Sequence, residues 1–435
     1  MMPAKSPLVM AAALATLAGP AVNAHGGAPH VTGDRADRAL AALQSELDGY
    51  VSSGKIPGAV AAIGYGDAPP SFIAAGHIAD DPGAAAAAPD SLWRIYSMTK
   101  PITAMAAMKL IEEGKLKLDE PISDFIPAFK NMRVVVAPAT SLDSRPASHP
   151  VTVRELLTHT SGLTYEFFGT GPLFQEYKRL GLLGGRVGLA ASAAQPATLE
   201  QFADRVATVP LLSEPGAEWH YSIGLDVLGR VIEVASGMPF DRFVQQSILD
   251  PLGMSSTFWT VPQSDAGRLA TAYYWKGEQR LPFEIGTTSM WLRPARVDYG
   301  GSGLVSSARD YDRFLQMLAN GGSVGGVRVL EPATVKLALS NLLPPGVHIV
   351  GNITPAPVAA QGFGAGGEVF LKDVPGGVHA GTYGWFGAAG SFAFIDPVKR
   401  LRVTVMVNYF PDNKWPLYAD VVKTLYRDKT SAEVF

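Results

Sequence analysis

Apolar positions near the start of the chain repeat with two different periods. Over residues 34–51 they are spaced as on one face of a helix, and the turn residues at 54–58 end this pattern. Two short runs with the composition of strands follow at 59–65 and 72–75, separated by the turn sequence Gly-Asp-Ala-Pro-Pro. The pattern predicts a helix followed by a β-hairpin.

Strand-like runs return near the C-terminus, and they occupy 383–387, 391–397 and 401–408. A helix is predicted after them at 415–426. The intervening chain instead carries helix-start signals, such as the capping-box pair Thr152 and Glu155.

Strands from both ends of the chain, with helices between them, predict two lobes. We expect residues 25–96 and 301–435 to form an α/β lobe, in which an antiparallel sheet is flanked by the N- and C-terminal helices. Residues 97–300 are expected to form an inserted, mainly helical lobe. The predicted fold class is therefore α/β plus all-α, with a cleft between the lobes.

The first residues have the features of an export signal. Lys5 is followed by an apolar run at 8–17 that is too short to cross a bilayer, and small residues lead to Ala24. We expect a signal peptide at 1–24, cleaved near Ala24, and a periplasmic or secreted mature protein without a membrane span. An ordinary apolar N-terminus is the alternative.

Composition narrows the set of partners. The 435-residue chain is 47% hydrophobic, has a formal net charge of −3 and contains no cysteine, so disulfides and thiol chemistry are excluded. No basic run indicates nucleic acid, and the eight histidines are scattered without metal-ligand spacing. We expect no cofactor, no metal and a small-molecule partner, and the oligomeric state stays open.

The most informative stretch begins at Ser97. Lys100 follows three positions later, at the entrance of an apolar run with helical spacing, so both side chains emerge on one face of the predicted helix. A serine hydroxyl is a weak nucleophile unless a base takes its proton, and a neutral lysine amine can be that base. The pattern predicts Ser97 as a nucleophile and Lys100 as its activating partner, with a plain helix-capping serine as the alternative.

Other residues compete for this chemistry. Ser52 and Lys55 repeat the same spacing, but no apolar run follows them. Ser323 lies in a Gly-x-Ser-x-Gly pentad, which in an α/β-hydrolase joins a strand to a helix, whereas here it follows a predicted helix and precedes a strand-like run. Spacing also leaves open a Ser-His-Asp triad, and the histidines available for it are His159, His220 and His379.

Tyr221 lies on a turn just ahead of a run with helical spacing at 225–232. A side chain in that position can project into a cleft. From spacing alone, packing with a satisfied hydroxyl is the commoner role for such a tyrosine, and both roles stay open.

Four patches in the same order resemble the serine β-lactamase-related superfamily, and in particular the family VIII carboxylesterases. They are Ser-Met-Thr-Lys-Pro-Ile at 97–102, Leu-Leu-Thr-His-Thr-Ser-Gly-Leu at 156–163, Tyr-Ser at 221–222 and Gly-Trp-Phe-Gly-Ala-Ala-Gly at 384–390. The resemblance runs from about residue 38 to the C-terminal helix. It implies a β-lactamase/penicillin-binding-protein-like fold and a serine hydrolase that cleaves short- or medium-chain carboxylic esters.

The resemblance also implies a role for each site residue. Ser97 attacks the acyl carbon and forms an acyl-enzyme, Lys100 and Tyr221 share the general-base role, and Tyr221 returns the proton to the leaving alcohol. The backbone N–H groups of Ser97 and Ala388 form the oxyanion hole. Four nearby residues are expected to line the substrate-binding surface, namely Ser222, Trp385, Phe386 and Gly387.

Two departures from penicillin-processing relatives bear on the substrate. Those relatives carry Tyr-x-Asn and Lys-Thr-Gly, where this chain has Tyr-Ser-Ile at 221–223 and Trp-Phe-Gly at 385–387. The missing lysine would pair with a substrate carboxylate, and its absence favours an uncharged ester. The alternatives are an acyltransferase, a weak β-lactamase or D-amino-peptidase of the same fold, and a non-catalytic cell-wall or ligand-binding module.

Overall fold

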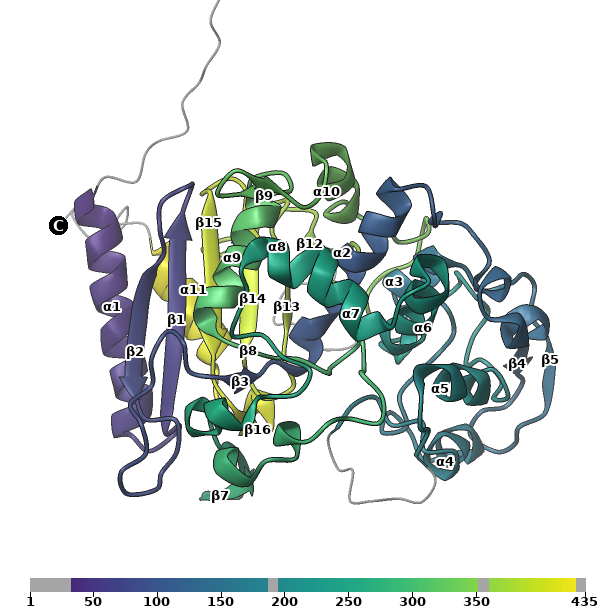
Figure 1. Cartoon of the computed structure of the whole chain (residues 1–435), viewed down its shortest axis with the longest axis horizontal. Helices are drawn as coiled ribbons and strands as arrows, with labels where there is room; N and C mark the ends of the chain where they lie inside the picture. Colours follow the sequence, from purple (N-terminus) through teal and green to yellow (C-terminus); the bar gives the residue numbers. More distant parts are fainter. Residues whose placement is uncertain (1–32, 187–194, 351–359, 428–435) are drawn as a thin grey trace, which may run out of the picture.

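The computed structural model describes residues 33–186, 195–350 and 360–427, and its central feature is a seven-stranded sheet (Figure 1). The strand order is β11-β12-β13-β14-β15-β1-β2, and neighbouring strands run antiparallel. The strands are β1 (Gly58–Tyr65), β2 (Ser71–Gly76), β11 (Gln361–Phe363), β12 (Glu368–Phe370), β13 (Tyr383–Phe386), β14 (Phe392–Asp396) and β15 (Leu401–Met406). The two ends of the chain meet where β1 pairs with β15.

Strand β1 is buried on both faces because each face of the sheet packs on a hydrophobic core. Successive side chains of a strand point to opposite faces. Val60 packs into the core that contains α2 (Thr99–Glu112), whereas Ala61 packs into the core beneath α1 (Gly33–Ser52) and α11 (Leu417–Tyr426). This double burial explains why the β1 sequence is continuously apolar rather than alternating.

Helices α1 and α11 confirm that the first and last helices flank the sheet, as the sequence predicts. Both helices pack into the same core, and they contact each other (Figure 1). Helix α1 matches the predicted range to within one residue at each end. Helix α11 begins at Leu417 because Trp415 has an extended backbone, which is the conformation favoured before a proline.

The opposite face of the sheet is covered by α9 (Ala308–Ala319), which contacts β1, β14 and β15. The Ser307 hydroxyl caps this helix by accepting a hydrogen bond from the Asp310 amide at 3.1 Å. Arg402 of β15 and Asp312 of α9 form a buried ion pair with two hydrogen bonds of 3.0 and 3.1 Å. This pair fixes α9 against the sheet.

The remaining helices gather mostly at the end of the molecule opposite α1 (Figure 1). The capping box predicted for Thr152 and Glu155 is present at the start of α3. These helices are α3 (Val153–Leu157), α4 (Pro172–Arg179), α5 (Leu199–Val206), α6 (Gly224–Ser236), α7 (Phe240–Val244), α8 (Asp250–Leu252) and, closer to the sheet, α10 (Pro332–Ala338).

Smaller sheets complete the described structure. They pair β3 (Trp93–Arg94) with β8 (Val305–Ser306), β4 (Arg133–Val135) with β5 (Ser144–Pro146), β9 (Ser323–Val324) with β10 (Val327–Arg328), and β6 (Ala272–Lys276) with both β7 (Gln279–Glu284) and β16 (Tyr409–Phe410). The β6–β7 hairpin lies inside the range 97–300 that the sequence assigns to helices. The exact division into lobes stays a prediction, and the predicted signal peptide at 1–24 lies outside the described residues.

Within 33–186, 195–350 and 360–427, no helix combines the length and the apolar character that crossing a bilayer requires.

We predict that replacing Asp312 by Ala lowers the free energy of unfolding by about 3–5 kcal/mol, because the Arg402 guanidinium loses its buried counter-ion. Urea unfolding followed by circular dichroism measures this change. Asp67→Ala removes the partner of the exposed Arg400 and is the matched control, with an expected loss below about 1 kcal/mol. Equal losses of unfolding free energy in the two variants would show that the Arg402–Asp312 ion pair does not stabilise the packing of α9 on the sheet.

Candidate active site

Ser97 lies at the junction of a short 3-10 helix, Tyr96–Met98, and helix α2. Helix α2 is apolar on nearly every side and runs through the main core, so its start is fixed in position. Ser97 itself is partly exposed. Met98, and not Ser97, occupies the N-cap position of α2, and no side chain caps the helix. A capping role therefore does not account for this serine.

The backbone just before Ser97 is strained. Tyr96 has φ = 41°, in the left-handed region that costs a non-glycine residue roughly 1 kcal/mol or more. The Tyr96 ring is held in place by edge contacts with Trp291 and Phe410, at centroid distances of 6.1 and 5.5 Å. This packing stabilises the sharp bend that presents Ser97.

Lys100 is completely buried, and its ammonium nitrogen has three partners. Lys100 Nζ lies 3.2 Å from Ser97 Oγ, 3.1 Å from the Tyr165 hydroxyl and 2.8 Å from the Gly301 carbonyl oxygen. The structure therefore brings the two residues of the predicted pair within hydrogen-bonding distance. It also gives the buried amine enough polar partners to offset its desolvation.

The segment 299–304 packs along α2 and supplies the Gly301 carbonyl that contacts Lys100. Its backbone is tied to the helix, because Thr103 Oγ1 donates to the Gly300 carbonyl at 2.7 Å and Thr99 Oγ1 accepts from the Leu304 amide at 3.1 Å. The Gly301 amide donates to Oδ1 of Asp226 at 2.7 Å. The same glycine therefore links a buried carboxylate to the Lys100 amine.

Asp226 is completely buried, and its second carboxylate oxygen, Oδ2, has no hydrogen-bond partner among the described residues. Burial raises the pKa of Asp226 to about 6, although the Lys100 charge and the Gly301 N–H act in the opposite direction. The sequence analysis did not single out this residue. The only sign of it in the sequence is that an acidic residue occupies the apolar face of the helix that follows Tyr221.

Tyr221 lies beside Lys100, whose Nζ is 4.6 Å from the centroid of the Tyr221 ring. The Tyr221 hydroxyl accepts a hydrogen bond of 3.1 Å from Nε1 of Trp385. Tyr221 therefore approaches Lys100, the partner of Ser97, from a distant part of the chain, and Trp385 of strand β13 orients its phenol.

His159 supports Tyr221 from behind. It is buried, and its ring meets the Tyr221 ring at a centroid distance of 4.6 Å. The Ser222 amide donates to Nδ1 of His159 at 3.2 Å, so Nδ1 is an acceptor and the proton of the neutral ring is on Nε2. Burial and the nearby Lys100 charge lower the pKa of His159 well below its usual range. This histidine is a neutral positioning residue.

Strand β13 delivers its residues to two different faces of the sheet. The Trp385 side chain packs with Trp219 and Phe363 next to Tyr221, whereas the Phe386 ring packs on Tyr418 of α11 at 4.9 Å. Strand alternation therefore turns Phe386 away from Ser97. Phe386 also packs against the cluster that contains Trp385, and substrate contact through its side chain, which the resemblance implies, stays a prediction.

Ser222 also lies behind the site. It is completely buried, and its hydroxyl is 3.1 Å from Nδ1 of His159 and accepts from the Gly224 amide at 3.2 Å. The backbone turns the Ser222 side chain inward, whereas Tyr221 turns outward, and the expected contact of Ser222 with the substrate stays a prediction. Its position supports a role in holding His159.

The loop that follows β13 lies against the backbone that precedes Ser97. A Cβ atom on Gly387 would come within 2.6 Å of the Ile95 carbonyl oxygen, so only glycine allows this approach. Ala388 is exposed, and its amide N–H donates no hydrogen bond within the part of the chain that the structure describes. The amide is therefore free to serve an oxyanion, as the sequence predicts, and that role stays a prediction.

Tyr165 is a site residue that the sequence analysis missed. Its hydroxyl contacts Lys100 Nζ, and its ring stacks with that of Phe167 at 5.0 Å. Burial and the neighbouring Tyr221 raise the pKa of Tyr165 well above its usual range, so it is a neutral phenol. Phe167 and Phe168 are 61% and 51% exposed and form an apolar edge beside the two tyrosines.

Of the competing candidates, Ser52 and Ser323 lie away from this site, whereas His159 packs behind Tyr221. Ser52 ends α1 with its hydroxyl on the Gly49 carbonyl, and the Lys55 ammonium stacks on Tyr50 and Trp415. Ser323 begins the β9–β10 hairpin. Each of the three histidines has its own partner, and these pairs are His159 with Ser222, His220 with Glu218, and His379 with Asp396.

The described ranges contain no group of three or more His, Cys, Asp or Glu side chains arranged to hold a metal ion. The groups that the structure gathers around Lys100 are the Ser97 hydroxyl, the Tyr165 and Tyr221 side chains and the Gly301 carbonyl.

A family model described as Beta-lactamase matches residues 38–423, and the chain belongs to this family. It is 35% identical over 332 residues to Protein Rv1367c of Mycobacterium tuberculosis, which covers 74% of this chain and 79% of that protein. It is 30% identical over 337 residues to esterase EstB of Burkholderia gladioli, covering 73% and 78% of the two chains.

Among solved structures, the chain is similar to EstCE1, described as a hydrolase with promiscuous acyltransferase activity. The TM-score is 0.73 with 27% sequence identity, covering 90% of this chain and all of that chain. The predicted β-lactamase/penicillin-binding-protein-like fold is confirmed, and the chain is a member of a hydrolase family with esterase relatives.

We predict that Asp226 makes folding stability pH-dependent. A raised pKa means that its contribution is fully present below the unfolded value near 4 and is lost as pH rises through about 6. Relative to Asp226→Asn, the wild type should gain roughly 1 kcal/mol of unfolding free energy between about pH 8 and 5. Urea titrations at several pH values measure this difference.

The exposed Asp204, on helix α5, provides the control for this measurement. Asp204→Asn removes an exposed carboxylate and should change the free energy of unfolding by less than about 0.5 kcal/mol. If the difference in unfolding free energy between wild type and Asp226→Asn does not change with pH, burial does not raise the pKa of Asp226 as described.

Proposed function

We propose that this protein is a serine carboxylesterase that hydrolyses short- or medium-chain esters through an acyl-enzyme on Ser97. The observation that carries the proposal is the contact between a partly exposed Ser97 hydroxyl and the fully buried Lys100 amine. Tyr221 and the free amide of Ala388 add a proton carrier and an oxyanion donor beside this pair. EstB and EstCE1 are an esterase and a hydrolase, which supports the same reaction class.

The partners of Lys100 Nζ fit both stages of proton transfer. A neutral amine has two N–H donors and one lone pair, so it can donate to the Gly301 carbonyl and the Tyr165 hydroxyl while accepting the Ser97 proton. After transfer, the ammonium has three donors for the same three oxygens. Little rearrangement is therefore needed as charge moves, which is the condition for efficient electrostatic catalysis.

In the proposed reaction, Ser97 Oγ attacks the ester carbonyl carbon and its proton passes to the Lys100–Tyr221 pair. The negative oxygen of the tetrahedral intermediate is held by the N–H groups of Ser97 and Ala388. The C–O bond to the alcohol then breaks, and Tyr221 delivers the proton to the departing alkoxide. Water attacks the acyl-enzyme by the reverse proton route and releases the carboxylic acid.

The substrate side of the cleft favours an uncharged, apolar acyl group. Trp385 occupies the place where a penicillin-processing site carries a lysine, and its N–H is already bonded to Tyr221. The exposed rings of Phe167 and Phe168 offer apolar surface beside Tyr221. A substrate carboxylate would find no matching cation from β13, and we therefore propose esters rather than β-lactam acids.

Transfer of the acyl group to an alcohol other than water is the second candidate function. EstCE1 carries a promiscuous acyltransferase activity by its description, which favours this alternative over a non-catalytic binding module. Adding a competing alcohol during turnover distinguishes the two reactions, because a transferase yields a new ester where a hydrolase yields acid.

We predict that Ser97→Ala lowers kcat/KM for a short-chain nitrophenyl ester by at least about 10³-fold, because the replacement removes the oxygen that attacks the ester carbonyl carbon. Unfolding temperature should change little, since Ser97 makes no structural cap. Ser52→Ala and Ser323→Ala are matched controls and should retain wild-type rates. Loss of activity in either control, with activity retained in Ser97→Ala, would show that the nucleophile is misassigned.

We predict that Tyr221→Phe lowers kcat by about 10²-fold or more, because the phenol proton is lost while the ring and its packing stay. Steady-state kinetics with the same ester measure the change. Tyr50→Phe is the control, since its hydroxyl bonds to Asp420 on the α1–α11 side of the sheet. A wild-type kcat for Tyr221→Phe would remove this residue from the proton route.

A further inference from the structure

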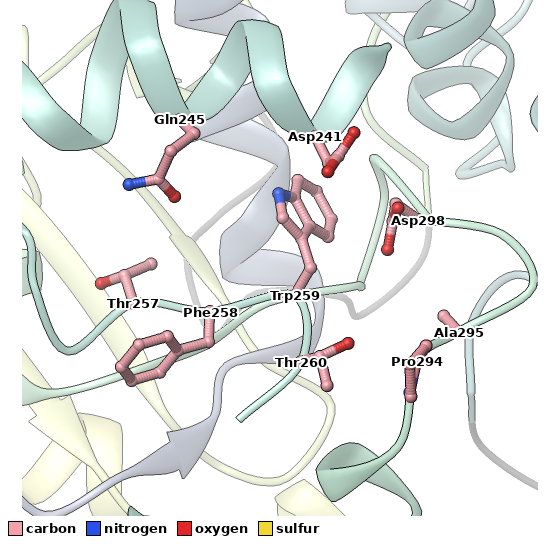
Figure 2. Close-up of a pocket in the computed structure, with 9 residues that line it drawn as sticks. All are labelled: Asp241, Gln245, Thr257, Phe258, Trp259, Thr260, Pro294, Ala295 and Asp298. Carbon is pink, nitrogen blue, oxygen red and sulfur yellow. The ribbon is translucent and has the colours of Figure 1, made fainter. Parts of the chain in front are cut away.

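A pocket of about 340 Å³ opens beside helix α7, and its lining comes from elements that do not carry Ser97, Lys100 or Tyr221 (Figure 2). Its walls come from α7 and the residues after it, from segment 257–260 and from segment 294–298. The lining residues are Asp241, Gln245, Thr257, Phe258, Trp259, Thr260, Pro294, Ala295 and Asp298. The volume falls within the range of small-molecule sites in proteins.

Two carboxylates give this pocket an acidic character. Asp241 and Asp298 both line it, and for neither carboxylate is an ion pair or a hydrogen bond found among the described residues. Burial, and then the Asp241 charge, raise the pKa of Asp298 to about 6, and Arg186 only partly offsets them. The Asp241 charge therefore opposes ionisation of Asp298, and a bound cation would relieve that repulsion.

Trp259 adds a second, independent feature. Its side chain is more than nine-tenths buried, and its indole Nε1 has no hydrogen-bond partner among the described residues. Figure 2 shows the indole standing in the pocket between Gln245 and Asp241, with its nitrogen on the side of Gln245. Aromatic faces attract cations. The unpartnered indole N–H is a hydrogen-bond donor, so a ligand that carries an acceptor besides its charge would complete it.

The lining favours an organic cation over a metal ion. A hard metal ion needs several oxygen ligands, and only two carboxylates line the pocket, in agreement with the lack of any three-residue acidic or histidine group in the described ranges. The remaining walls include the side chains of Phe258, Pro294 and Ala295. An ammonium group attached to an apolar body matches carboxylates on one side and apolar walls on the other.

We propose that this pocket binds a small organic ammonium compound, with the charge held between Asp241 and Asp298 and the apolar body against Trp259 and Pro294. The site is separate from the ester-hydrolysis site, so its occupancy does not depend on the proposed reaction.

The site also adjoins the segment that positions Lys100. Asp298 directly precedes segment 299–304, and Trp259 packs against the backbone of Gly303, where a Cβ atom would come within 2.5 Å of the indole. The carbonyl oxygen of Gly301 in the same segment accepts from Lys100. A ligand in this pocket would therefore contact a segment that is continuous with the active-site support.

Isothermal titration of the full chain with benzylammonium chloride tests this proposal, at about pH 8, which is above the raised pKa of Asp298 and leaves the ligand charged. Benzyl alcohol, of the same shape without the charge, is the matched ligand control. The Ser97→Ala variant is titrated in parallel, so that binding near the nucleophile is recognised. We expect saturable 1:1 binding of benzylammonium to the wild type and no measurable binding of benzyl alcohol.

Asp298→Asn and Asp241→Asn should each weaken benzylammonium binding at least tenfold, while Asp204→Asn on α5 leaves it unchanged. Unfolding temperatures measured without ligand show whether each variant is folded, and the two pocket variants provide independent tests. Absence of binding to the wild type, equal binding of benzyl alcohol, or unchanged affinity in both folded pocket variants would overturn the proposal.

Discussion

The buried amine of Lys100 is the group on which the rest of this site depends. A fully buried ammonium is tolerated only where polar atoms replace its water, and here the Gly301 carbonyl, the Tyr165 phenol and the Ser97 hydroxyl take that place. The surrounding scaffold maintains this arrangement. Thr99 and Thr103 tie helix α2 to segment 299–304, and Asp226 holds the Gly301 amide.

The sheet brings the second half of the site to the first. Because β15 pairs with β1, residues more than three hundred positions apart share one layer, and β13 reaches the start of α2. Close approach at Gly387 and alternation along β13 then set Trp385 against Tyr221 and turn Phe386 to the opposite face. The position of the phenol is therefore a consequence of sheet register.

Local sequence patterns predict the parts of this structure that local forces decide. Helix periodicity, the capping box at Thr152 and the apolar β1 run are all found where the sequence places them. The spacing of Ser97 and Lys100 is also local, which is why their proximity is predictable.

Tyr165, Asp226 and Gly301 could not be found in this way, because each meets Lys100 or its partner only after distant segments pack together. The inward turn of Ser222 depends likewise on His159, some sixty residues away.

The most direct test of this account is intact-mass and peptide mass spectrometry of the enzyme quenched during turnover of a nitrophenyl ester. The account predicts a single acyl adduct on the peptide that contains Ser97, which is absent when Lys100 is replaced by Ala. An adduct on a peptide containing another serine, such as Ser323, or hydrolysis without any adduct in rapidly quenched samples, would contradict it.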